Sequence, residues 1–522
     1  MNINGDVIFR KRDNVYGLVE CDDFDFVIML REHFAFYADG YQFQSSYKNK
    51  LWDGKIRLLN AADGSIFLGL WQEVKEFCER HNKVCHVDPR INIKPLPKER
   101  FSAFVDALDV HTGGEAITPY DYQQDAAHYA LQMQKCLLLS PTSSGKSLIQ
   151  YMLLRMYLKI MENSDKQILI IVPKSGLVKQ MVGDFKDYSS ANGWDVDANI
   201  HQISGPCKAT DKKVTICTYQ SLTNKKTQPK REWFKRFGAV MVDEVHTATA
   251  KSVMYILESC TEADWKVGLT GTLDECKTNE MTLRGLFGPV KTVITTKELM
   301  DRGTVAQLTV KIGILKHAAK YCKFLRSADR GAKDAKTGKP KKTKASYTEE
   351  ISYITSSVER NRFIMRFTAG LKGNTILMIN QIEHGEFLYK TMKKFLPDRK
   401  IYLYTGAVGI NERETIRQLM EAQDGAIIIG SLGVLSTGIS IKRLHNLVFA
   451  HPSKSRVKVL QTVGRLLRKS KFGNNVTMFD LVDDCSIGSY ENYTLEHGRI
   501  RTRFYHDQQF DHEVVMIDLE AA

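Results

Sequence analysis

The chain has 522 residues, which a usual domain size of ~150 residues divides into three or four domains. Hydrophobic residues make up 43 % and charged residues 26 %, ordinary values for a globular protein that exclude a fibrous or wholly disordered chain. The net charge of +14 favours a polyanionic partner, because Lys and Arg side chains gain free energy by releasing counterions from a phosphate backbone.

Residues 1–105 are expected to form an N-terminal α+β domain that binds DNA. Within them, aromatic and basic side chains alternate, a pattern that suits base stacking combined with phosphate neutralisation. The same pattern also suits a small domain whose aromatic residues are simply its core. The aromatic members are Tyr41, Phe43, Tyr47 and Trp52, and the candidate DNA contacts are Lys48, Lys50, Trp52, Lys55 and Arg57.

Residues 106–300 alternate short β-branched runs with longer amphipathic stretches, which predicts parallel strands joined by helices. In such a sheet, ligands bind at the carboxyl ends of the strands. The expected strands are Cys136–Ser140, Gln167–Pro173, Val214–Tyr219, Ala239–Glu244 and Lys266–Thr272, with helices at Ser147–Met161 and Leu177–Tyr188.

The segment Ser-Pro-Thr-Ser-Ser-Gly-Lys-Ser follows the first strand and opens a helix, the context that a phosphate-binding loop needs. Backbone N–H groups of the loop and of the helix N-terminus can face the phosphates of ATP. We expect Gly145 to allow close approach, Lys146 to reach the β- and γ-phosphates, and Ser147 to bind Mg²⁺. The expected ATP-binding residues here are Ser140, Pro141, Thr142, Ser143, Ser144, Gly145, Lys146 and Ser147.

Asp243 and Glu244 end an apolar strand, where two adjacent carboxylates are costly unless a cation or a water molecule uses them. We expect Asp243 to be a second Mg²⁺ partner and Glu244 to orient the attacking water as a base. An ordinary acidic strand end is the alternative. His246 would lie close to the γ-phosphate side and relay its state.

A second α/β lobe is expected over 301–485, joined to the first near residue 300. Its expected strands are Thr375–Ile379, Lys400–Thr405, Ala426–Ser431 and Asn446–His451, with helices at Glu383–Phe395, Asn411–Ala422 and Arg456–Lys469. Residues 326–344 interrupt this pattern with eight basic and two acidic residues. We expect a flexible, solvated loop there, serving either solubility or contact with a phosphate backbone. Residues 486–522 are polar and expected to be a short helical C-terminal region.

Arg465 and Arg468 lie three residues apart on an expected helix, so they project from the same face. A solvated basic helix is one interpretation. The other is that both side chains cross the cleft between the lobes and neutralise charge that develops on the transferred phosphoryl group. Hydrolysis would then require the two lobes to close.

As a set and in this order, these motifs resemble those of superfamily 2 helicases over roughly residues 115–485. The matching segments are Gln123, Ser140–Ser147, Asp243–His246, Thr270–Thr272, Ser436–Ser440 and Gln461–Arg468. The resemblance implies two RecA-like lobes in tandem and ATP hydrolysis with Mg²⁺.

The same resemblance implies roles for further residues. Gln123 would read adenine and Gly438 would contact the nucleotide, while Gln461 would join Lys146, Asp243, Glu244, Arg465 and Arg468 in catalysis. His246, Thr270, Gly271 and Thr272 would couple the nucleotide site to the nucleic acid. The expected contacts with the sugar–phosphate backbone are Pro173, Lys174, Thr218, Gln220, Ser436 and Thr437.

The N-terminal segments Asp39–Tyr41 and Trp52–Arg57 resemble the amino-terminal domain of the UvsW helicases of tailed phages. This resemblance implies 3′→5′ translocation on DNA, branch migration of forks and four-way junctions, and removal of RNA from R-loops. Two departures stand out. Ser440 occupies a position where many relatives carry an acidic residue, and the insertion at 326–344 has no assigned role in the family.

Together these observations predict an ATP-dependent DNA helicase of recombination, repair and replication. Its expected partners are single-stranded, forked and four-way-junction DNA and RNA–DNA hybrids, with no membrane, and it is expected to act as a monomer. Ten cysteines without a Cys-x-x-Cys pair fit a reducing compartment, the cytoplasm of a cell or of a phage host. The alternatives are an RNA helicase, the motor subunit of a restriction-type translocase, or a silent nucleic-acid clamp. The presence of Lys146 and Glu244 argues against the clamp.

Overall fold

The computed structural model describes residues 6–91, 96–203, 210–226, 228–247, 250–273, 279–333, 340–438, 441, 443–451, 464 and 475–520. The chain forms two compact units, Met1–Ile294 and Thr295–Ala522. Among the described residues, no helix combines the length and the apolar character needed to cross a bilayer.

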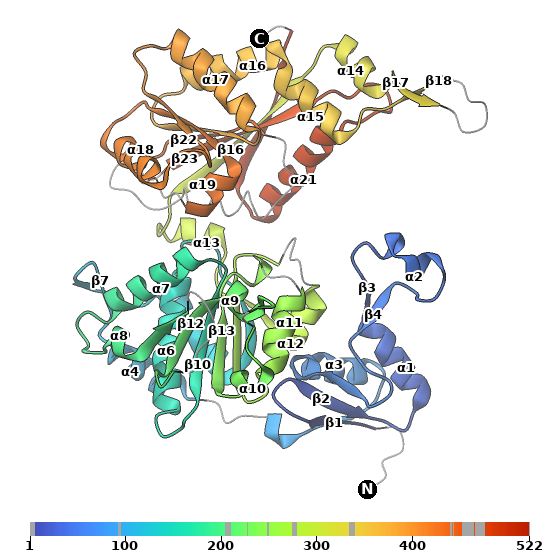
Figure 1. Cartoon of the computed structure of the whole chain (residues 1–522), viewed down its shortest axis with the longest axis vertical. Helices are drawn as coiled ribbons and strands as arrows, with labels where there is room; N and C mark the ends of the chain where they lie inside the picture. The colour runs from blue at the N-terminus through green and yellow to red at the C-terminus, as the bar shows by residue number, and fades with distance from the viewer. Residues whose placement is uncertain are drawn as a thin grey trace. The chain divides into compact units, whose positions relative to one another are not determined.

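The first unit begins with a small mixed sheet in the order β5-β2-β1-β6. A separate hairpin, β3–β4, extends from it and carries a short helical segment (Figure 1). This confirms the small N-terminal domain expected from the sequence. Its elements are β1 (Val7–Lys11), β2 (Tyr16–Glu20), α1 (Phe24–His33), β3 (Ala35–Tyr37), η1 (Tyr41–Phe43), α2 (Ser45–Lys48), β4 (Lys55–Arg57), β5 (Ser65–Phe67), η2 (Leu68–Leu70), α3 (Trp71–Arg80), β6 (Cys85–Val87) and η3 (Pro89–Ile91).

The rest of the first unit is built on a seven-stranded sheet in the order β11-β12-β10-β13-β14-β9-β15. Every pairing in it is parallel, as the βαβ pattern of the sequence predicts. The strands are β9 (Lys135–Leu139), β10 (Gln167–Val172), β11 (Ile200–Gln202), β12 (Val214–Thr218), β13 (Phe237–Val242), β14 (Trp265–Thr270) and β15 (Val290–Thr292). The main helices are α4 (Lys98–Asp106), α5 (Asp121–Met133), α6 (Lys146–Ile160), α7 (Ser175–Tyr188), α9 (Tyr219–Thr223), α10 (Arg231–Phe234), α11 (Ala250–Ser259) and α12 (Glu280–Phe287).

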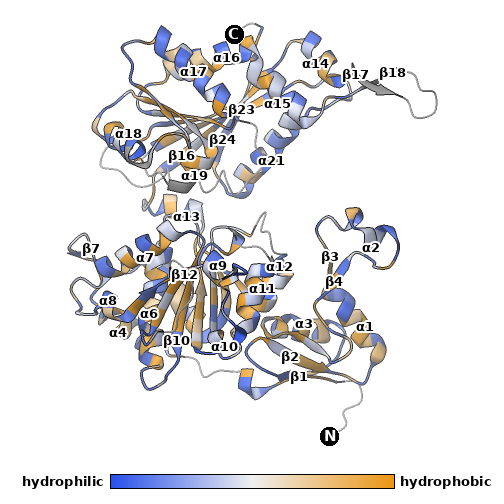
Figure 2. Ribbon diagram, in the orientation of Figure 1, coloured by the Kyte–Doolittle hydropathy of each residue, from blue (hydrophilic) through white to orange (hydrophobic). Residues whose placement is uncertain are grey.

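Strand β10 is apolar at successive positions because helices cover both faces of this sheet (Figure 2). Successive side chains of a strand point to opposite faces. Leu169 and Ile171 accordingly belong to one hydrophobic cluster, and Ile168 and Ile170 belong to another. The buried strands keep the sheet rigid, and the polar residues at its carboxyl edge are therefore held in fixed positions.

The N-terminal domain shares a hydrophobic core with the large sheet. One hydrophobic cluster contains buried residues from both parts: those from Val7 to Cys78 belong to the N-terminal domain, and those from Leu137 to Phe287 belong to the large sheet and its helices. At Gly69 the two parts approach so closely that an added Cβ would lie 2.4 Å from the carbonyl oxygen of Arg284. The N-terminal domain therefore packs directly on the sheet that carries the phosphate-binding loop.

The second unit contains another seven-stranded parallel sheet, in the order β20-β21-β19-β22-β23-β16-β24. The two sheets confirm the predicted pair of RecA-like lobes. The strands are β16 (Gln307–Lys316), β19 (Thr375–Ile379), β20 (Ile401–Tyr404), β21 (Ile427–Ser431), β22 (Asn446–Phe449), β23 (Asn475–Asp484) and β24 (Asp511–Asp518). The helices are α13 (Thr296–Asp301), α14 (Ala319–Arg326), α15 (Tyr347–Ser356), α16 (Val358–Gly370), α17 (Ile382–Phe395), α18 (Ile410–Ala422), α19 (Leu432–Gly438) and α21 (Tyr493–Asp507).

Two parts of the second unit differ from expectation. The predicted solvated loop at 326–344 instead contains the antiparallel strands β17 (Ala328–Lys333) and β18 (Pro340–Thr343). The region 486–522 holds the helix α21, as expected, but also β24, which pairs with β16 along eight residues. Its apolar residues Val514–Ile517 supply a strand pattern that the surrounding polar residues obscured.

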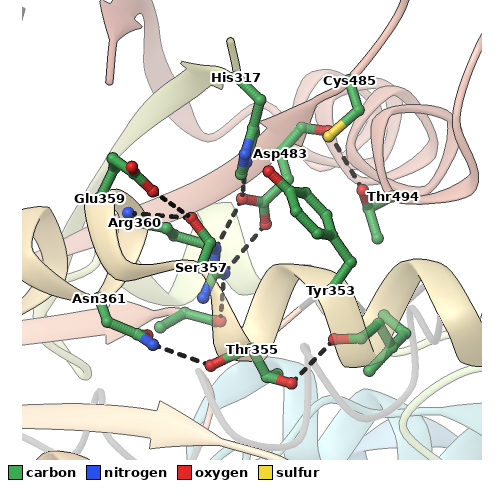
Figure 3. Close-up of polar contacts among 12 residues, drawn as sticks. His317, Tyr353, Thr355, Ser357, Glu359, Arg360, Asn361, Asp483, Cys485 and Thr494 are labelled. Atoms are coloured by element: carbon green, nitrogen blue, oxygen red, sulfur yellow. Dashed lines mark hydrogen bonds and ion pairs between the residues drawn. The ribbon is translucent and has the colours of Figure 1, made fainter. Parts of the chain in front are cut away.

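A buried ionic cluster ties the second sheet to α16 (Figure 3). Arg360 donates two hydrogen bonds to the carboxylate of Asp483 and a third to the carbonyl oxygen of Ala450, at 2.8 Å. His317 contacts the same carboxylate at 2.9 Å. Burial raises the pKa of Asp483, but the charges of Arg360 and His317 outweigh it and hold this pKa at about 2. The carboxyl end of β22 is thereby fixed by an ion pair that is fully enclosed.

Candidate functional site

Three motifs predicted to act together lie at the ends of three neighbouring strands. In the first sheet β13 pairs with β14, and β14 pairs with β9. The loop Ser140–Ser147 follows β9, Asp243–His246 follows β13, and Gly271-Thr272 follows β14. Because parallel strands present their carboxyl ends at one edge, residues as far apart in the chain as Ser140 and Thr272 converge there.

The phosphate-binding loop is held by hydrogen bonds among its own residues. Ser140 and Ser144 are fully buried, and their hydroxyl oxygens lie 2.6 Å apart. The Ser144 hydroxyl also donates to the carbonyl oxygen of Pro141. Ser143 and Gly145 adopt positive φ values of 69° and 81°, which reverse the chain before α6 starts at Lys146. Thr142 lies between Pro141 and Ser143 on the same loop.

Gln123 packs against this loop from α5. Its amide nitrogen donates to the carbonyl oxygen of Ser144 at 2.9 Å, and its amide oxygen accepts from the backbone of Tyr120. Gly145 has a φ of 81°, which favours glycine, and a Cβ there would lie 2.1 Å from the Gln123 amide nitrogen, so a larger residue would also displace the Gln123 side chain. Gln123 thus joins the loop, through Ser144, to the start of α5, through Tyr120, and its predicted contact with adenine would require these hydrogen bonds to change.

A continuous chain of polar contacts runs from Lys146 across the strand ends. The Lys146 ammonium lies 3.2 Å from both the Ser140 carbonyl oxygen and Glu244 Oε1. The other carboxylate oxygen of Glu244 is 3.3 Å from Nδ1 of His246, which is 2.8 Å from the Thr270 hydroxyl. That hydroxyl donates to the Thr272 carbonyl oxygen at 2.9 Å.

The charges along this series of contacts allow a phosphate bound at Lys146 to affect Thr270. Glu244 has a φ of 49°, uncommon for a residue with a side chain, and this turn brings its carboxylate to Lys146. Burial lowers the pKa of His246, so its ring is neutral near pH 7. A neutral ring with a proton on Nδ1 can donate to Thr270. A change at Lys146 or Glu244 can therefore reach Thr270–Thr272 through direct contacts.

Asp243 carries a buried carboxylate oxygen, Oδ1, without a hydrogen-bond partner. Burial first, and then the neighbouring Glu244 charge, raise the pKa of its carboxyl group, while Lys146 acts in the opposite direction. A shielded oxygen in a structured protein normally has a partner. This arrangement suits an oxygen that accepts a cation.

Two tyrosines that were not expected from the sequence contact the phosphate-binding loop. The Tyr188 hydroxyl lies 2.9 Å from the Ser147 hydroxyl, the predicted Mg²⁺ partner. The Tyr122 hydroxyl donates to the Ser144 carbonyl oxygen at 3.2 Å. Both residues sit on ordinary amphipathic helices, so no sequence pattern distinguishes them from core tyrosines.

The predicted nucleic-acid contacts of the first lobe lie at the same edge of the sheet. Lys174 and Gln220 are exposed, following the adjacent strands β10 and β12, and Pro173 is half-buried beside Lys174. Thr218 is instead 7 % exposed, and its hydroxyl caps α9 by accepting from the Ser221 backbone. Lys174 and Gln220 are therefore the side chains available to a ligand.

In the N-terminal domain the aromatic residues of the predicted pattern are not core. Phe43 is 79 % exposed, while Tyr47 packs edge-on against Tyr41 on the hairpin. Lys48 and Lys50 are exposed. Trp52 is half-buried and donates to the backbone of the hairpin at 2.9 Å.

Two of the predicted cations on this hairpin have carboxylate partners in the domain itself. Lys55 lies 2.9 Å from Glu32, and Arg57 pairs with both Glu32 and Asp53. Their charges are therefore balanced locally, which leaves Lys48 and Lys50 as the stronger candidates for contact with DNA.

Several predicted residues are not placed. Gln461, Arg465 and Arg468 lie outside the described residues, as does Ser440. Gly438 ends α19, the helix that contains Ser436 and Thr437 and follows β21. The roles predicted for these residues stay predictions.

Comparison with known proteins gives matches along the chain. A family model described as "DNA helicase UvsW, N-terminal" matches residues 6–88, and one described as "Type III restriction enzyme, res subunit" matches residues 116–275. The ATP-dependent DNA helicase uvsW of enterobacteria phage T4 is 35 % identical, with 98 % of this chain and 100 % of that protein covered.

Solved structures agree with these matches. The crystal structure of T4 UvsW superposes with a TM-score of 0.51 and 32 % identity, and the match covers 98 % of this chain and 100 % of that one. A fragment of an HsdR subunit of a type I restriction enzyme from Vibrio vulnificus YJ016 has a TM-score of 0.54 at 17 % identity, over 80 % and 72 % of the two chains. At that identity it shows a shared fold alone. With its two RecA-like lobes, its phosphate-binding loop and these matches, the chain belongs to the UvsW family of superfamily 2 helicases and is an ATP-dependent DNA helicase.

Proposed function

We propose that this helicase remodels branched DNA in recombination, repair and replication, by branch migration of forks and four-way junctions and by unwinding of R-loops. The chain of contacts from Lys146 through Glu244 and His246 to Thr270 is the observation that carries the proposal. It connects the residue that meets the phosphates to the strand end beside the nucleic-acid track. We place the protein in the cytoplasm of the host cell, acting as a monomer.

Hydrolysis in this proposal depends on positioning and charge. Lys146 holds the β- and γ-phosphates, and Glu244 orients the attacking water and accepts its proton. Glu244 already contacts Lys146, so phosphate binding draws the ammonium group away from the carboxylate and releases it toward water. Gln461, Arg465 and Arg468 then complete the site from the second lobe, and closure links each turnover to movement on DNA.

The residues present fit a magnesium ion. Asp243 offers a buried oxygen without a hydrogen-bond partner, and the Ser147 hydroxyl lies at the start of α6. Oxygen ligands of this kind are what Mg²⁺ prefers. If held by these residues, Mg²⁺ would supply positive charge that offsets the charge on the phosphoryl oxygens.

Asp243→Asn should lower Mg²⁺-dependent ATP turnover at least ~10²-fold, because it removes an anionic ligand worth several kcal/mol.

The same change should raise the melting temperature of the protein without nucleotide at pH 8. The folded-state pKa of Asp243 is raised, so its ionisation costs stability above the unfolded pKa of ~3.9, and the cost grows as pH rises toward the folded value. Thermal melts at pH 5 and pH 8 check this, and equal melting temperatures of the two proteins at pH 8 would contradict it.

The substrate is tested by measuring ATPase turnover with single-stranded DNA, duplex, forked DNA, four-way junctions and RNA as separate stimulators. We expect forks and four-way junctions to stimulate most, since the N-terminal domain adds a second surface beside the motor. Stimulation by RNA equal to that by branched DNA would defeat the proposal and favour an RNA helicase.

Replacing Lys48 and Lys50 by Ala should weaken DNA binding and flatten its dependence on salt. Each lost phosphate contact lowers the slope of log K against log salt by ~0.9 for duplex DNA. The matched pair Lys55→Ala/Arg57→Ala should change the slope less, because these cations already pair with Glu32 and Asp53. Fluorescence anisotropy at several salt concentrations measures both, and equal slopes for the two double variants would refute this assignment.

A further inference from the structure

A cavity of about 240 Å³ lies at the opposite end of β9 from the phosphate-binding loop. Lys135 opens the strand and lines the cavity, whereas Ser140 follows the other end of the strand. The N-terminal domain contributes Lys11 of β1, Trp71 of α3 and Arg90, and the segments at 132–134 and 288–289 of the large-sheet part complete the wall. The cavity is therefore built by two parts of the first unit and is separate from the ATP site.

Three ammonium groups gather at this edge. Lys135 is 8 % exposed, and its ammonium group reaches only the Asp264 carbonyl oxygen, at 3.4 Å. Lys266 lies beside it in the register of β14, is 1 % exposed, and donates to two carbonyl oxygens at 3.0 Å. Within the described ranges, no ion pair joins Lys11, Lys135 or Lys266 to a carboxylate.

The electrostatic consequence is visible in the titration of these groups. Burial, followed by repulsion from Lys266 and Lys11, lowers the pKa of Lys135 to about 7, against a smaller opposing effect of Asp264 and Asp13. Burial lowers the pKa of Lys266 to about 8. Buried like charges without a direct carboxylate partner are costly, and a bound anion would offset that cost.

The wall of the cavity has the chemistry of an anion site. Gln72, Gln132 and Gln134 line it and carry amide donors, and no carboxylate is among its lining residues. Arg90 is held at the rim by Asp88, at 2.7 Å, and by the Lys11 carbonyl oxygen, at 2.8 Å. Asp88 therefore balances the charge of Arg90, which offers hydrogen-bond donors, while Lys135 and Lys11 supply positive charge that has no carboxylate partner among the described residues. We propose that this cavity binds a phosphate group, supplied by a nucleic-acid backbone or by free phosphate.

Occupation of this site would join the N-terminal domain to the first helicase sheet. Lys11 and Arg90 belong to the former, and Lys135 belongs to the latter. An anion held by both parts stabilises their packing, which already includes the ion pair between Arg284 and Glu73 at 3.0 Å. Such a site would strengthen the attachment of the DNA-binding domain to the motor whenever a phosphate is present.

The test measures sulfate binding by calorimetry in the full-length Lys146→Ala protein, which removes the phosphate-loop lysine as a competing ligand. Sulfate keeps its charge between pH 6 and pH 8, so a change in affinity reports on the protein. With Lys135 titrating near pH 7, its protonated fraction falls about tenfold over this range, and we expect the affinity to fall about tenfold. Adding Lys135→Met should weaken binding at pH 6 about tenfold and remove most of the pH dependence.

Two further variants separate the site from a folding effect. Lys11→Met, at the cavity wall, should weaken sulfate binding several-fold. Lys266 is also buried but lies outside the cavity lining. Lys266→Met should therefore retain sulfate binding and shift the pH at which affinity is lost to a higher value, because it relieves the repulsion on Lys135. Equal sulfate affinity with and without Lys135 would overturn the proposal.

The source of the phosphate is identified by competition. Displacement of sulfate by an unphosphorylated oligonucleotide assigns the site to the nucleic-acid backbone, and displacement by orthophosphate alone assigns it to free phosphate. Failure of both to displace sulfate would overturn the proposal. None of these measurements depends on ATP turnover, so the result is independent of the helicase function.

Discussion

Lys146→Ala should reduce ATP turnover at least ~10²–10³-fold, the usual effect of removing a fixed positive group from a site where negative charge develops. In the structure the ammonium group is held by the Ser140 carbonyl oxygen and by Glu244, so it is already positioned before ATP arrives. The variant loses the positive charge that Lys146 is expected to bring to the β- and γ-phosphates. It also leaves Asp243 and Glu244 without their nearest cation, which should raise the pKa of Asp243 further.

The matched variant is Glu244→Gln, which keeps the shape of the side chain but removes the base. It should bind ATP with nearly unchanged affinity and turn over ~10²–10⁴-fold more slowly. Nucleotide binding by calorimetry and phosphate release by a coupled assay distinguish the two. If both variants hydrolysed ATP at the wild-type rate, the assignment of the catalytic site would be wrong.

Arg468→Ala should lower ATP turnover by ~10³–10⁵, the effect of an arginine that neutralises the transferred phosphoryl group. Arg468 follows Arg465 by three residues, so both would project from one face if this segment forms the helix expected from the sequence. Since Arg468 lies in the part of the sequence expected to form the second lobe, the loss should appear in turnover and leave ATP binding to the first lobe nearly intact.

Arg468→Lys provides the control for charge without geometry. Lysine retains the positive charge but lacks the planar fork of donors, so partial recovery would indicate that the guanidinium geometry matters. Single-turnover measurement with DNA present isolates the hydrolysis step. Wild-type turnover in Arg468→Ala would eliminate this residue from catalysis and reduce the helix to a solvated basic surface.

The sequence by itself determined the architecture of both lobes. Apolar β-branched runs such as Gln167–Val172 can be satisfied only between two layers of helices, so their repetition specified parallel sheets. It also determined that the loop Ser140–Ser147 and the pair Asp243-Glu244 follow strands, since each motif comes directly after an apolar run. Local pattern was sufficient for these features because the residues that specify them are neighbours in the chain.

The tertiary structure alone decided which of these residues touch. The order of β13, β14 and β9 in the sheet sets Glu244 against Lys146 and His246 against Thr270, and no sequence spacing encodes that order. It also gave Ser147 a tyrosine partner and brought Lys11 to the same edge as Lys135. Likewise it placed β24 beside β16, because pairing between strands is a long-range interaction that a local hydrophobic pattern does not specify.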